Sequence, residues 1–160
     1  MKIAVALSGG IDSALSAIML KNQGHDIIGI TFRVLEAYRY SDTMQSLTDQ
    51  SIGDAKKIAD QYGFSHHVFD IEEGFKDIVI DPFCSEYMNG RTPNPCILCN
   101  RSIKFGRLLD YALSLGYEKI ATGHYAKVHQ CDNGRITVSR NKDPKKDQSY
   151  FLSMLSQDIL

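Results

Sequence analysis

The sequence predicts an α/β fold in which helices cover both faces of a parallel sheet. Short apolar runs rich in β-branched residues alternate along the chain with runs whose apolar residues recur at helical spacing. This alternation implies right-handed crossovers between parallel strands, a Rossmann-like arrangement. The chain has 160 residues, 43% of them hydrophobic and 23% charged, which suits one domain with a substantial core.

The first elements surround a short glycine-containing turn. Residues 2–7 are apolar and partly β-branched, which predicts a buried strand, and residues 14–21 predict a helix that Gly24 stops. Residues 25–32 predict a second buried strand. The polar stretch 33–50 has no clear period, so we expect a loop over the site there.

The remaining elements continue the alternation up to a hairpin. In order, we expect a helix at 52–62, a strand at 66–71, helical structure at 75–88 limited or restarted by Pro82, a stiff loop at 89–95, a helix at 100–115, a strand at 119–123 and a hairpin turn at 131–134. Ligands of such sheets bind at the carboxyl ends of the strands.

Residues 8–13, Ser-Gly-Gly-Ile-Asp-Ser, form the glycine turn between the first strand and the first helix. Adjacent glycines let the backbone bend and point amides outward, and the helix dipole favours an anion there, most naturally a phosphate. Ser8 and Ser13 can add hydroxyl donors, while Asp12 could hold a Mg²⁺ that bridges phosphates. An ordinary βα turn explains the two glycines equally well. The absence of a Walker lysine motif and of G-x-G-x-x-G weakens P-loop kinase and NAD-binding interpretations.

Residues 91–100, Arg-Thr-Pro-Asn-Pro-Cys-Ile-Leu-Cys-Asn, form a second motif, the cysteine motif. Cys99 falls at the start of a predicted helix, where the dipole lowers a thiol pKa and favours the nucleophilic thiolate, and Arg101 and Lys104 would add to that field. Alternatively, Cys96 and Cys99 are half of a zinc or iron–sulfur site. The other two cysteines and the histidines show no ligand spacing.

Charge and cysteine usage restrict the partners and the compartment. The net charge of −1 leaves no global basic field, so any RNA contact must come from local patches. No apolar run is long enough to span a membrane and no signal-peptide pattern opens the chain. Four cysteines without a secretion signal favour a reducing, cytoplasmic location.

The glycine turn resembles the PP-loop of ATP pyrophosphatases, which cleave ATP to AMP and pyrophosphate to activate an oxygen. Further motifs follow in order: Gly90–Pro95 with Cys99-Asn100, Ile103-Lys104-Phe105, Ala121–Ala126 and Lys146–Leu152. The set, which covers essentially the whole chain, is similar to bacterial tRNA-specific 2-thiouridylases, which thiolate the wobble uridine of certain tRNAs. The resemblance implies a HUP-type catalytic domain over residues 1–160.

The resemblance also implies roles for individual residues. The residues that would bind the ATP phosphates are Ala6, Leu7, Ser8, Gly9, Gly10, Ile11, Asp12 and Ser13. Phe32 would contact the nucleotide through its backbone, and Gly123 would lie against it. Cys99 would be the catalytic nucleophile, with Asp12 assisting through Mg²⁺. The residues that would meet the target base are Asn94, Pro95 and Cys96, and those that would touch tRNA are His124, Lys146, Asp147 and Gln148.

The implied reaction adenylates the C2 oxygen of a uridine turned out of the anticodon stack, and a sulfur nucleophile then displaces AMP. In the family, a later segment holds a persulfide cysteine and is followed by tRNA-binding and β domains. We therefore expect the chain to be either a truncated fragment or a minimal protein that needs a partner to supply the missing portion. In both cases we expect weak complete thiolation and the need for a sulfur donor, such as a persulfide carrier or a cysteine desulfurase relay. Many members have aspartate where this chain has Cys96, and a cysteine pair plus a downstream cysteine could instead hold an iron–sulfur cluster that delivers sulfide.

Two other functions stay open at this point. Another PP-loop enzyme with a small acceptor, such as a carboxylate or citrulline, predicts turnover of ATP to AMP without RNA. A non-catalytic metal-binding or RNA-binding module predicts stoichiometric zinc or iron and no pyrophosphate release.

Overall fold

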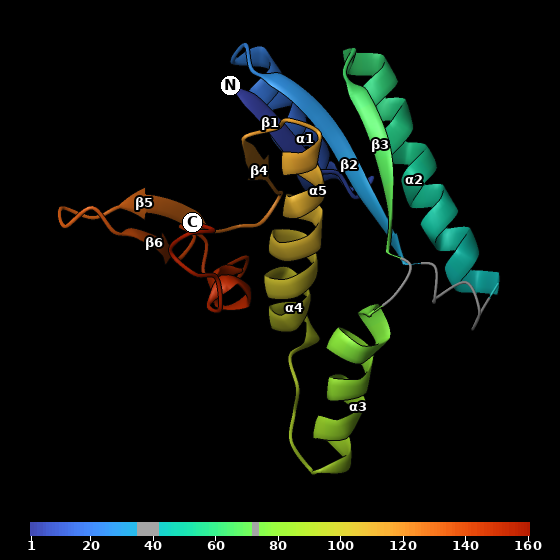
Figure 1. The fold of residues 1–160 in the computed structure, drawn as a ribbon, viewed down its shortest axis with the longest axis vertical. Helices are drawn as coiled ribbons and strands as arrows, with labels where there is room; N and C mark the ends of the chain where they lie inside the picture. The colour runs from blue at the N-terminus through green and yellow to red at the C-terminus, as the bar shows by residue number, and fades with distance from the viewer. Residues whose placement is uncertain (35–41, 72–73) are drawn as a thin grey trace. The chain divides into compact units, whose positions relative to one another are not determined.

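The computed structural model describes residues 1–34, 42–71 and 74–160 (Figure 1). The chain forms two compact units, each built from two chain segments. Unit 1 comprises residues 1–76 and 108–123, and unit 2 comprises residues 77–107 and 124–160.

Unit 1 contains a four-stranded sheet. Its strands are β1 (Lys2–Ala6), β2 (Asp26–Val34), β3 (Ser65–Ile71) and β4 (Lys119–Ala121). The spatial order is β3-β2-β1-β4, and each neighbouring pair is parallel. The predicted parallel sheet is confirmed, and the carboxyl ends of its strands lie at one edge, where the chain makes the glycine turn.

Helices cover both faces of this sheet, as predicted. Helices α1 (Ile11–Asn22) and α2 (Asp42–Tyr62) cover one face, and α5 (Leu108–Ser114) covers the other (Figure 1). Successive side chains of β1 point to opposite faces. One core cluster therefore contains Ile3, Val5, Leu7, Ala17, Ile27 and Ala55, and the other contains Ala4, Ile28, Ile30, Leu108 and Ala112.

The prediction of a loop over residues 33–50 is wrong where the structure describes that stretch. Strand β2 continues to Val34, and α2 already begins at Asp42, whereas residues 35–41 lie outside the described residues. Residues 42–50 contain neither glycine nor proline. A largely exposed helix needs no regular apolar period, so the absence of a period there did not exclude a helix.

Unit 2 consists of short helices and one hairpin. Its elements, apart from the π-helical turn η2 (Lys76–Ile80) at the unit boundary, are α3 (Asp81–Met88), α4 (Pro95–Leu98), the π-helical segment η3 (Cys99–Arg107), β5 (Lys127–Gln130), β6 (Ile136–Ser139) and the 3-10 helix η4 (Ser149–Leu152). The predicted hairpin is confirmed, since β5 and β6 pair antiparallel and Gly134 in their turn has φ +79°.

The helix predicted over residues 100–115 starts earlier than expected. Pro95 opens α4, and its missing N–H costs nothing at the first position of a helix. The chain is then π-helical over η3 and α-helical again from Leu108.

Within the described part of the chain, every helix is too short or too polar to cross a lipid bilayer.

Candidate functional site

The glycine turn is closed by hydrogen bonds between its own residues. Ser8 donates its backbone N–H to Ser13 Oγ over 3.2 Å, and the two hydroxyl oxygens lie 3.1 Å apart. Ser13 Oγ donates to the carbonyl of Gly10 over 3.0 Å. Gly9 has φ +76°, a conformation that favours glycine. The turn thus ends at Gly10, which caps α1 and leaves the first amides of that helix without intrahelical acceptors.

The Ser13 hydroxyl has a different role from the one expected. We predicted that its hydroxyl would add a donor for phosphate, but the side chain is buried and its proton goes to Gly10. A hydroxyl has one proton, so Ser8 must be the donor in the contact between the two serines. Ser13 therefore holds the turn in shape, and the groups it leaves for an anion are backbone amides.

Gly123 lies against this turn, as the strand-end rule predicts. A Cβ added to Gly123 would be 2.8 Å from the backbone nitrogen of Ser13 and 2.9 Å from the carbonyl carbon of Asp12. Ser16 Oγ lies 3.5 Å from the carbonyl oxygen of Thr122, the preceding residue. Only a residue without a side chain lets the end of the β4 segment approach the amino terminus of α1 this closely.

Helix α2 packs on the turn from another side. A Cβ on Gly9 would be 2.5 Å from the carbonyl oxygen of Ser51.

Phe32 packs its partly buried ring into the core cluster on the α5 face. This placement is compatible with a nucleotide contact made by the Phe32 backbone, the contact that the resemblance implies.

In unit 2, Asn94 and Cys96 sit at the start of α4. Asn94 caps the helix by accepting the backbone N–H of Cys96 at 3.2 Å. Cys96 is exposed and Cys99 is half-buried. Cys99 lies four residues after Pro95, at the junction of α4 and η3. The prediction that Cys99 lies in the first turn of a helix is therefore wrong.

The expected lowering of the Cys99 pKa is wrong. Burial raises the pKa of the Cys99 thiol, Lys104 acts in the lowering direction, and Cys96 adds a smaller raising effect. The helix-terminus argument fails because Cys99 is too far into the helix and is partly removed from water. Lys104 follows Cys99 by five residues, and i→i+5 bonding in a π-helix brings such residues together.

Replacing Lys104 with methionine is expected to move the pH midpoint of Cys99 alkylation upward. The charge of Lys104 favours the thiolate, and the thiolate is the species that reacts with iodoacetamide. The rate at Cys99 would be followed against pH by peptide mass spectrometry, with Lys142→Met as the matched control. A midpoint that stays in place or moves downward would contradict this role of Lys104.

Asn100 ties η3 to the Lys146–Leu152 motif. Its side chain is 2% exposed, and Nδ2 donates to the carbonyl of Phe151 over 3.0 Å. The other amide atom, Oδ1, is buried without a hydrogen-bond partner among the described residues. The segment that carries Cys99 is therefore anchored to η4 by a buried polar contact.

His124 is uncharged at neutral pH. Burial, with a smaller effect of the Lys104 charge, lowers the pKa of His124 to about 4. The ring centroid lies 6.2 Å from that of Phe105. Any contact of His124 with RNA would accordingly use a neutral ring as a hydrogen-bonding or stacking group, and not a cation.

The lowered pKa predicts that His124 makes stability fall as the medium becomes acidic. The His124 side chain binds a proton near pH 6.5 in the unfolded chain and near pH 4 in the folded chain. Its contribution to the free energy of unfolding is therefore complete above pH 6.5 and is lost as the pH falls toward 4. We expect His124→Asn to flatten the free energy of unfolding against pH across this window. Urea melts at several pH values measure it; an unchanged slope would contradict the prediction.

Lys146, Asp147 and Gln148 form an ordered turn. Asp147 Oδ1 accepts the backbone N–H of Asn141 at 3.0 Å, which is the main cause of the lowered pKa of Asp147. Gln148 and Tyr125 are joined twice, through Gln148 N–H to the Tyr125 carbonyl and Tyr125 N–H to Gln148 Oε1, each at 2.9 Å. Lys146 Nζ lies 5.4 Å from the Tyr125 ring centroid. The carboxylate and amide therefore shape the turn that presents Lys146.

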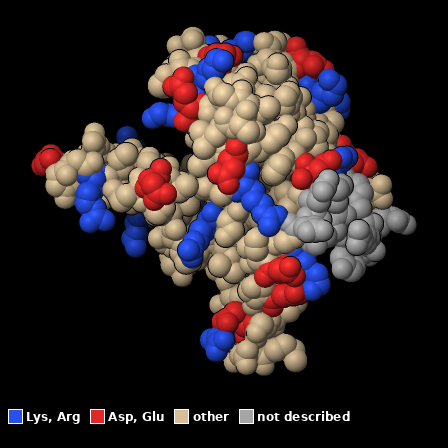
Figure 2. Space-filling model, in the orientation of Figure 1, with Lys and Arg blue, Asp and Glu red and all other residues tan. Residues whose placement is uncertain are grey.

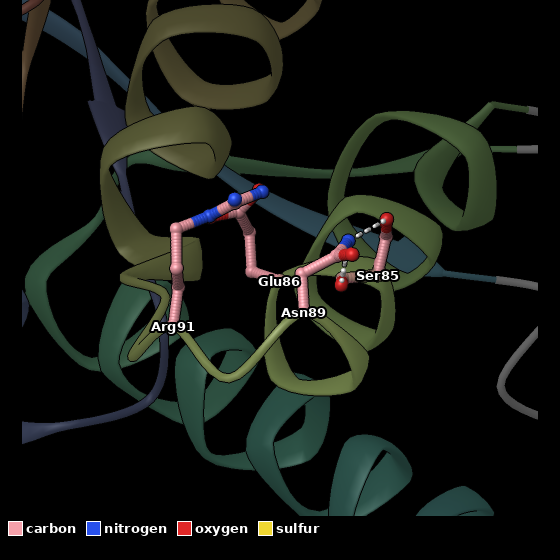
Figure 3. Close-up of polar contacts among 4 residues, drawn as sticks. All are labelled: Ser85, Glu86, Asn89 and Arg91. Atoms are coloured by element: carbon pink, nitrogen blue, oxygen red, sulfur yellow. Dashed lines mark hydrogen bonds and ion pairs between the residues drawn. The ribbon is translucent and has the colours of Figure 1, made fainter.

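The loop before the cysteine motif is fixed by a two-pronged ion pair. Arg91 Nε and Nη2 reach the two carboxylate oxygens of Glu86 at 2.5 and 2.6 Å (Figure 3). Asn89 Nδ2 donates to the carbonyl of Ser85 over 2.8 Å in the same region. These contacts hold residues 89–91 against the end of α3. Both ion-pair partners are exposed, so the energetic gain is small and the effect is mainly geometric.

The metal alternative finds little support in the donor set. Across residues 1–34, 42–71 and 74–160, no group of three or more His, Cys, Asp or Glu side chains could hold a metal ion. Among the described residues, Cys96 and Cys99 offer two ligands where a cluster or a structural zinc ion needs more.

Charge differs between the two units. Unit 2 has ten lysine and arginine residues against seven aspartate and glutamate residues, a net charge of +3, whereas unit 1 has eight against twelve, a net charge of −4. Residues 127–146 alone carry six basic residues against two acidic ones. On the face drawn in Figure 2, basic and acidic side chains are interspersed among uncharged ones. Unit 2 is therefore net positive although the chain as a whole has a net charge of −1.

The strand-end rule predicts that Thr31-Phe32, Asp70 and Gly123-His124 lie near the glycine turn. The structure brings Gly123 into contact with the turn and Thr31 into contact with Leu7, just before it.

Sequence reasoning missed residues that act through these groups. The carbonyl of Ser51 lies against Gly9 of the turn, and Ser51 stands in no motif. Asn100 stands in the cysteine motif but had no assigned role. Lys104 acts on the pKa of Cys99 in the lowering direction, as expected from the sequence.

A family model and named relatives match this chain over its whole length. A family model described as the tRNA methyl transferase HUP domain matches residues 1–160. A protein of Treponema denticola named tRNA-specific 2-thiouridylase MnmA is 48% identical over all of this chain and 44% of its own length. A protein of Persephonella marina with the same name is 42% identical over all of this chain and 46% of its own length. The chain thus spans less than half the length of these relatives.

Among solved structures, the predicted subunit of tRNA methyltransferase from Methanocaldococcus jannaschii aligns with a TM-score of 0.48 and 20% identity, over 90% of this chain and 56% of that one. The family match extends from the first residue to the last and includes the glycine turn, Gly123 and the cysteine motif. This chain therefore belongs to the tRNA methyl transferase HUP domain family.

Proposed function

We propose that this chain is the ATP-binding catalytic domain of a tRNA-uridine 2-sulfurtransferase that acts on the wobble uridine. The observation that carries the proposal is the contact between Gly123 and the amino terminus of α1, which leaves the glycine turn and the first helical amides together at the carboxyl end of β1. The names of the two relatives support the choice of tRNA thiolation.

The residues of the turn fit a nucleoside triphosphate with Mg²⁺. Amides at the start of a helix and a positive helix end suit phosphate oxygens. Asp12 is exposed in the first turn of α1, where its carboxylate would hold Mg²⁺ beside those oxygens. In this proposal ATP supplies the adenylyl group that makes the C2 oxygen of uridine a leaving group, with release of pyrophosphate.

The RNA-facing part of the proposal rests on unit 2. Every residue that the resemblance assigns to the target base or to tRNA falls in that unit, which is also the one with the net charge of +3. RNA binding depends on basic side chains near phosphates, and the base itself must leave its stack to be reached. Lys146 and the other basic residues of 127–146 would meet the phosphates, and Asn94, Pro95 and Cys96 the base.

The thiol chemistry is assigned to Cys99. A persulfide sulfur forms the new bond to C2 while the C2–O bond breaks and AMP leaves with the oxygen. Cys99 then attacks the sulfur of the carrier cysteine, which releases the sulfur to the base and leaves a disulfide that a cellular thiol must reduce. Burial raises the pKa of Cys99 and favours the protonated thiol, an effect that the charge of Lys104 opposes.

Nucleotide turnover separates this function from its alternatives. The protein at its full encoded length would be incubated with ATP, Mg²⁺ and unmodified tRNA, and pyrophosphate would be measured. We expect pyrophosphate release that depends on tRNA. Release with citrulline or a carboxylate in place of tRNA would favour the small-acceptor enzyme, and no release with any acceptor would favour the non-catalytic module.

A further inference from the structure

We propose that Thr31, backed by His66, is a positioning residue for the glycine turn, because its hydroxyl fixes the peptide group through which the chain enters that turn. The inference rests on the proposed function, since the ligand of the turn is taken to be ATP. All the contacts concerned lie within unit 1.

Leu7 is held on both sides after β1 has ended at Ala6. Its N–H donates to the carbonyl of Ile30 over 2.9 Å, and its carbonyl accepts from Thr31 Oγ1 at 2.5 Å. Leu7 and Thr31 are 1% and 6% exposed. A side-chain hydroxyl therefore continues the pairing of β1 with β2 by one residue, in a place shielded from water.

The position of this bond in the chain makes it relevant to the turn. The carbonyl of Leu7 and the N–H of Ser8 belong to the same planar peptide group. Thr31 holds the carbonyl end of that plane, and Ser13 Oγ holds the N–H end at 3.2 Å. Removal of the hydroxyl lets the plane rotate, and rotation displaces the Ser8 amide and the glycines that follow.

His66 completes the arrangement as a donor. Its Nε2 atom lies 2.8 Å from Thr31 Oγ1. The single hydroxyl proton of Thr31 goes to the Leu7 carbonyl, which cannot donate, so the contact with His66 needs a proton on Nε2. Hydrogen bonds thus run in one direction from His66 to Thr31 to Leu7, and protonation of Nδ1 leaves them intact.

The surroundings keep His66 in β3 mainly neutral. Its neighbours on the α2 face include Lys56 and Asp60, and His67 is adjacent in the strand. Burial, Lys56 and His67 lower the pKa of His66, and Asp60 opposes them. A neutral ring with the proton on Nε2 is the form that supports Thr31 at pH 7.

The test compares Thr31→Val, which keeps the shape and removes the hydroxyl, with Thr31→Ser, which keeps the hydroxyl. ATP affinity would be measured by calorimetry on the protein at its full encoded length, and the KM for ATP and kcat by tRNA-dependent pyrophosphate release. We expect Thr31→Val to weaken ATP binding and raise KM about three- to tenfold with kcat changed less than about twofold, as the loss of one buried hydrogen bond predicts. Thr31→Ser should stay within about twofold of the unaltered protein.

A second pair of variants keeps the inference falsifiable if Thr31→Val fails to fold. His66→Gln retains a donor, whereas His66→Phe retains an aromatic ring without one, and we expect only the latter to raise the KM for ATP, by about twofold. Equal losses in Thr31→Val and Thr31→Ser would overturn the inference, as would unchanged ATP binding in Thr31→Val. No ATP binding by the unaltered protein would overturn the proposed function, and this inference with it.

Discussion

Replacing Gly123 with alanine is expected to reduce ATP affinity by more than about tenfold. The new methyl group would lie 2.8 Å from the backbone nitrogen of Ser13 and 2.9 Å from the carbonyl carbon of Asp12. Both atoms belong to the backbone at the amino terminus of α1 and cannot swing aside as a flexible side chain can. The helix end must move, and the amides proposed to bind phosphate move with it.

Gly53→Ala is the matched control for this substitution. Gly53 lies within α2, and a Cβ added there would meet nothing within 4 Å. Alanine in a helix is favoured over glycine by about 1 kcal/mol, so this variant should bind ATP normally and melt at the same or a higher temperature. Both affinities would be measured by calorimetry on the full-length protein. Normal ATP binding by Gly123→Ala would show that the contact does not shape the site.

Replacing Cys99 with serine is expected to lower tRNA thiolation at least about a hundredfold while ATP binding stays unchanged. A hydroxyl has nearly the volume of a thiol but cannot attack sulfur to release it. Cys99 lies in unit 2, apart in the chain from the turn proposed to bind ATP. Thiolation would be followed with purified full-length protein and a persulfide donor. Substantial thiolation by the variant would remove Cys99 from the reaction.

Two further cysteine variants show whether the loss of thiolation is specific to Cys99. Cys84→Ser changes an exposed thiol in α3 and should leave thiolation intact. Cys96→Asp removes one thiol of the cysteine pair and keeps a short polar side chain, and a persulfide route through Cys99 should tolerate it. A route through an iron–sulfur cluster should lose its activity in this variant, because the cluster would lose a ligand.

The parallel sheet could be predicted from the sequence because its determinants are local. β1 and β2 are continuous apolar runs. Gly24 and Gly63, with φ of +82° and +70°, lie just after α1 and α2, the helices that follow these two strands. Gly123 was placed correctly by the rule that parallel strands end at one edge. The amino-terminal part of α2 was missed because an exposed polar helix and a polar loop have the same composition.

The electrostatics of the thiol could be predicted from the sequence only in part. The lowering effect of Lys104 on the pKa of Cys99 was expected from its position in the chain. The larger effect is the burial of the thiol, and spacing alone does not encode burial. The support of the turn by Thr31 and His66 joins residues 24 and 35 positions apart. Such contacts become visible only once strand register is known.

The most direct test of tRNA thiolation is nucleoside mass spectrometry of tRNA. A bacterial strain that lacks its own tRNA 2-thiouridylase would receive the gene at its full encoded length, either unaltered or as Cys99→Ser. We predict that the unaltered gene restores 2-thiouridine at the wobble position and the variant does not. Wobble uridine that carries a methyl group without sulfur, or equal 2-thiouridine in both strains, would contradict the proposed function.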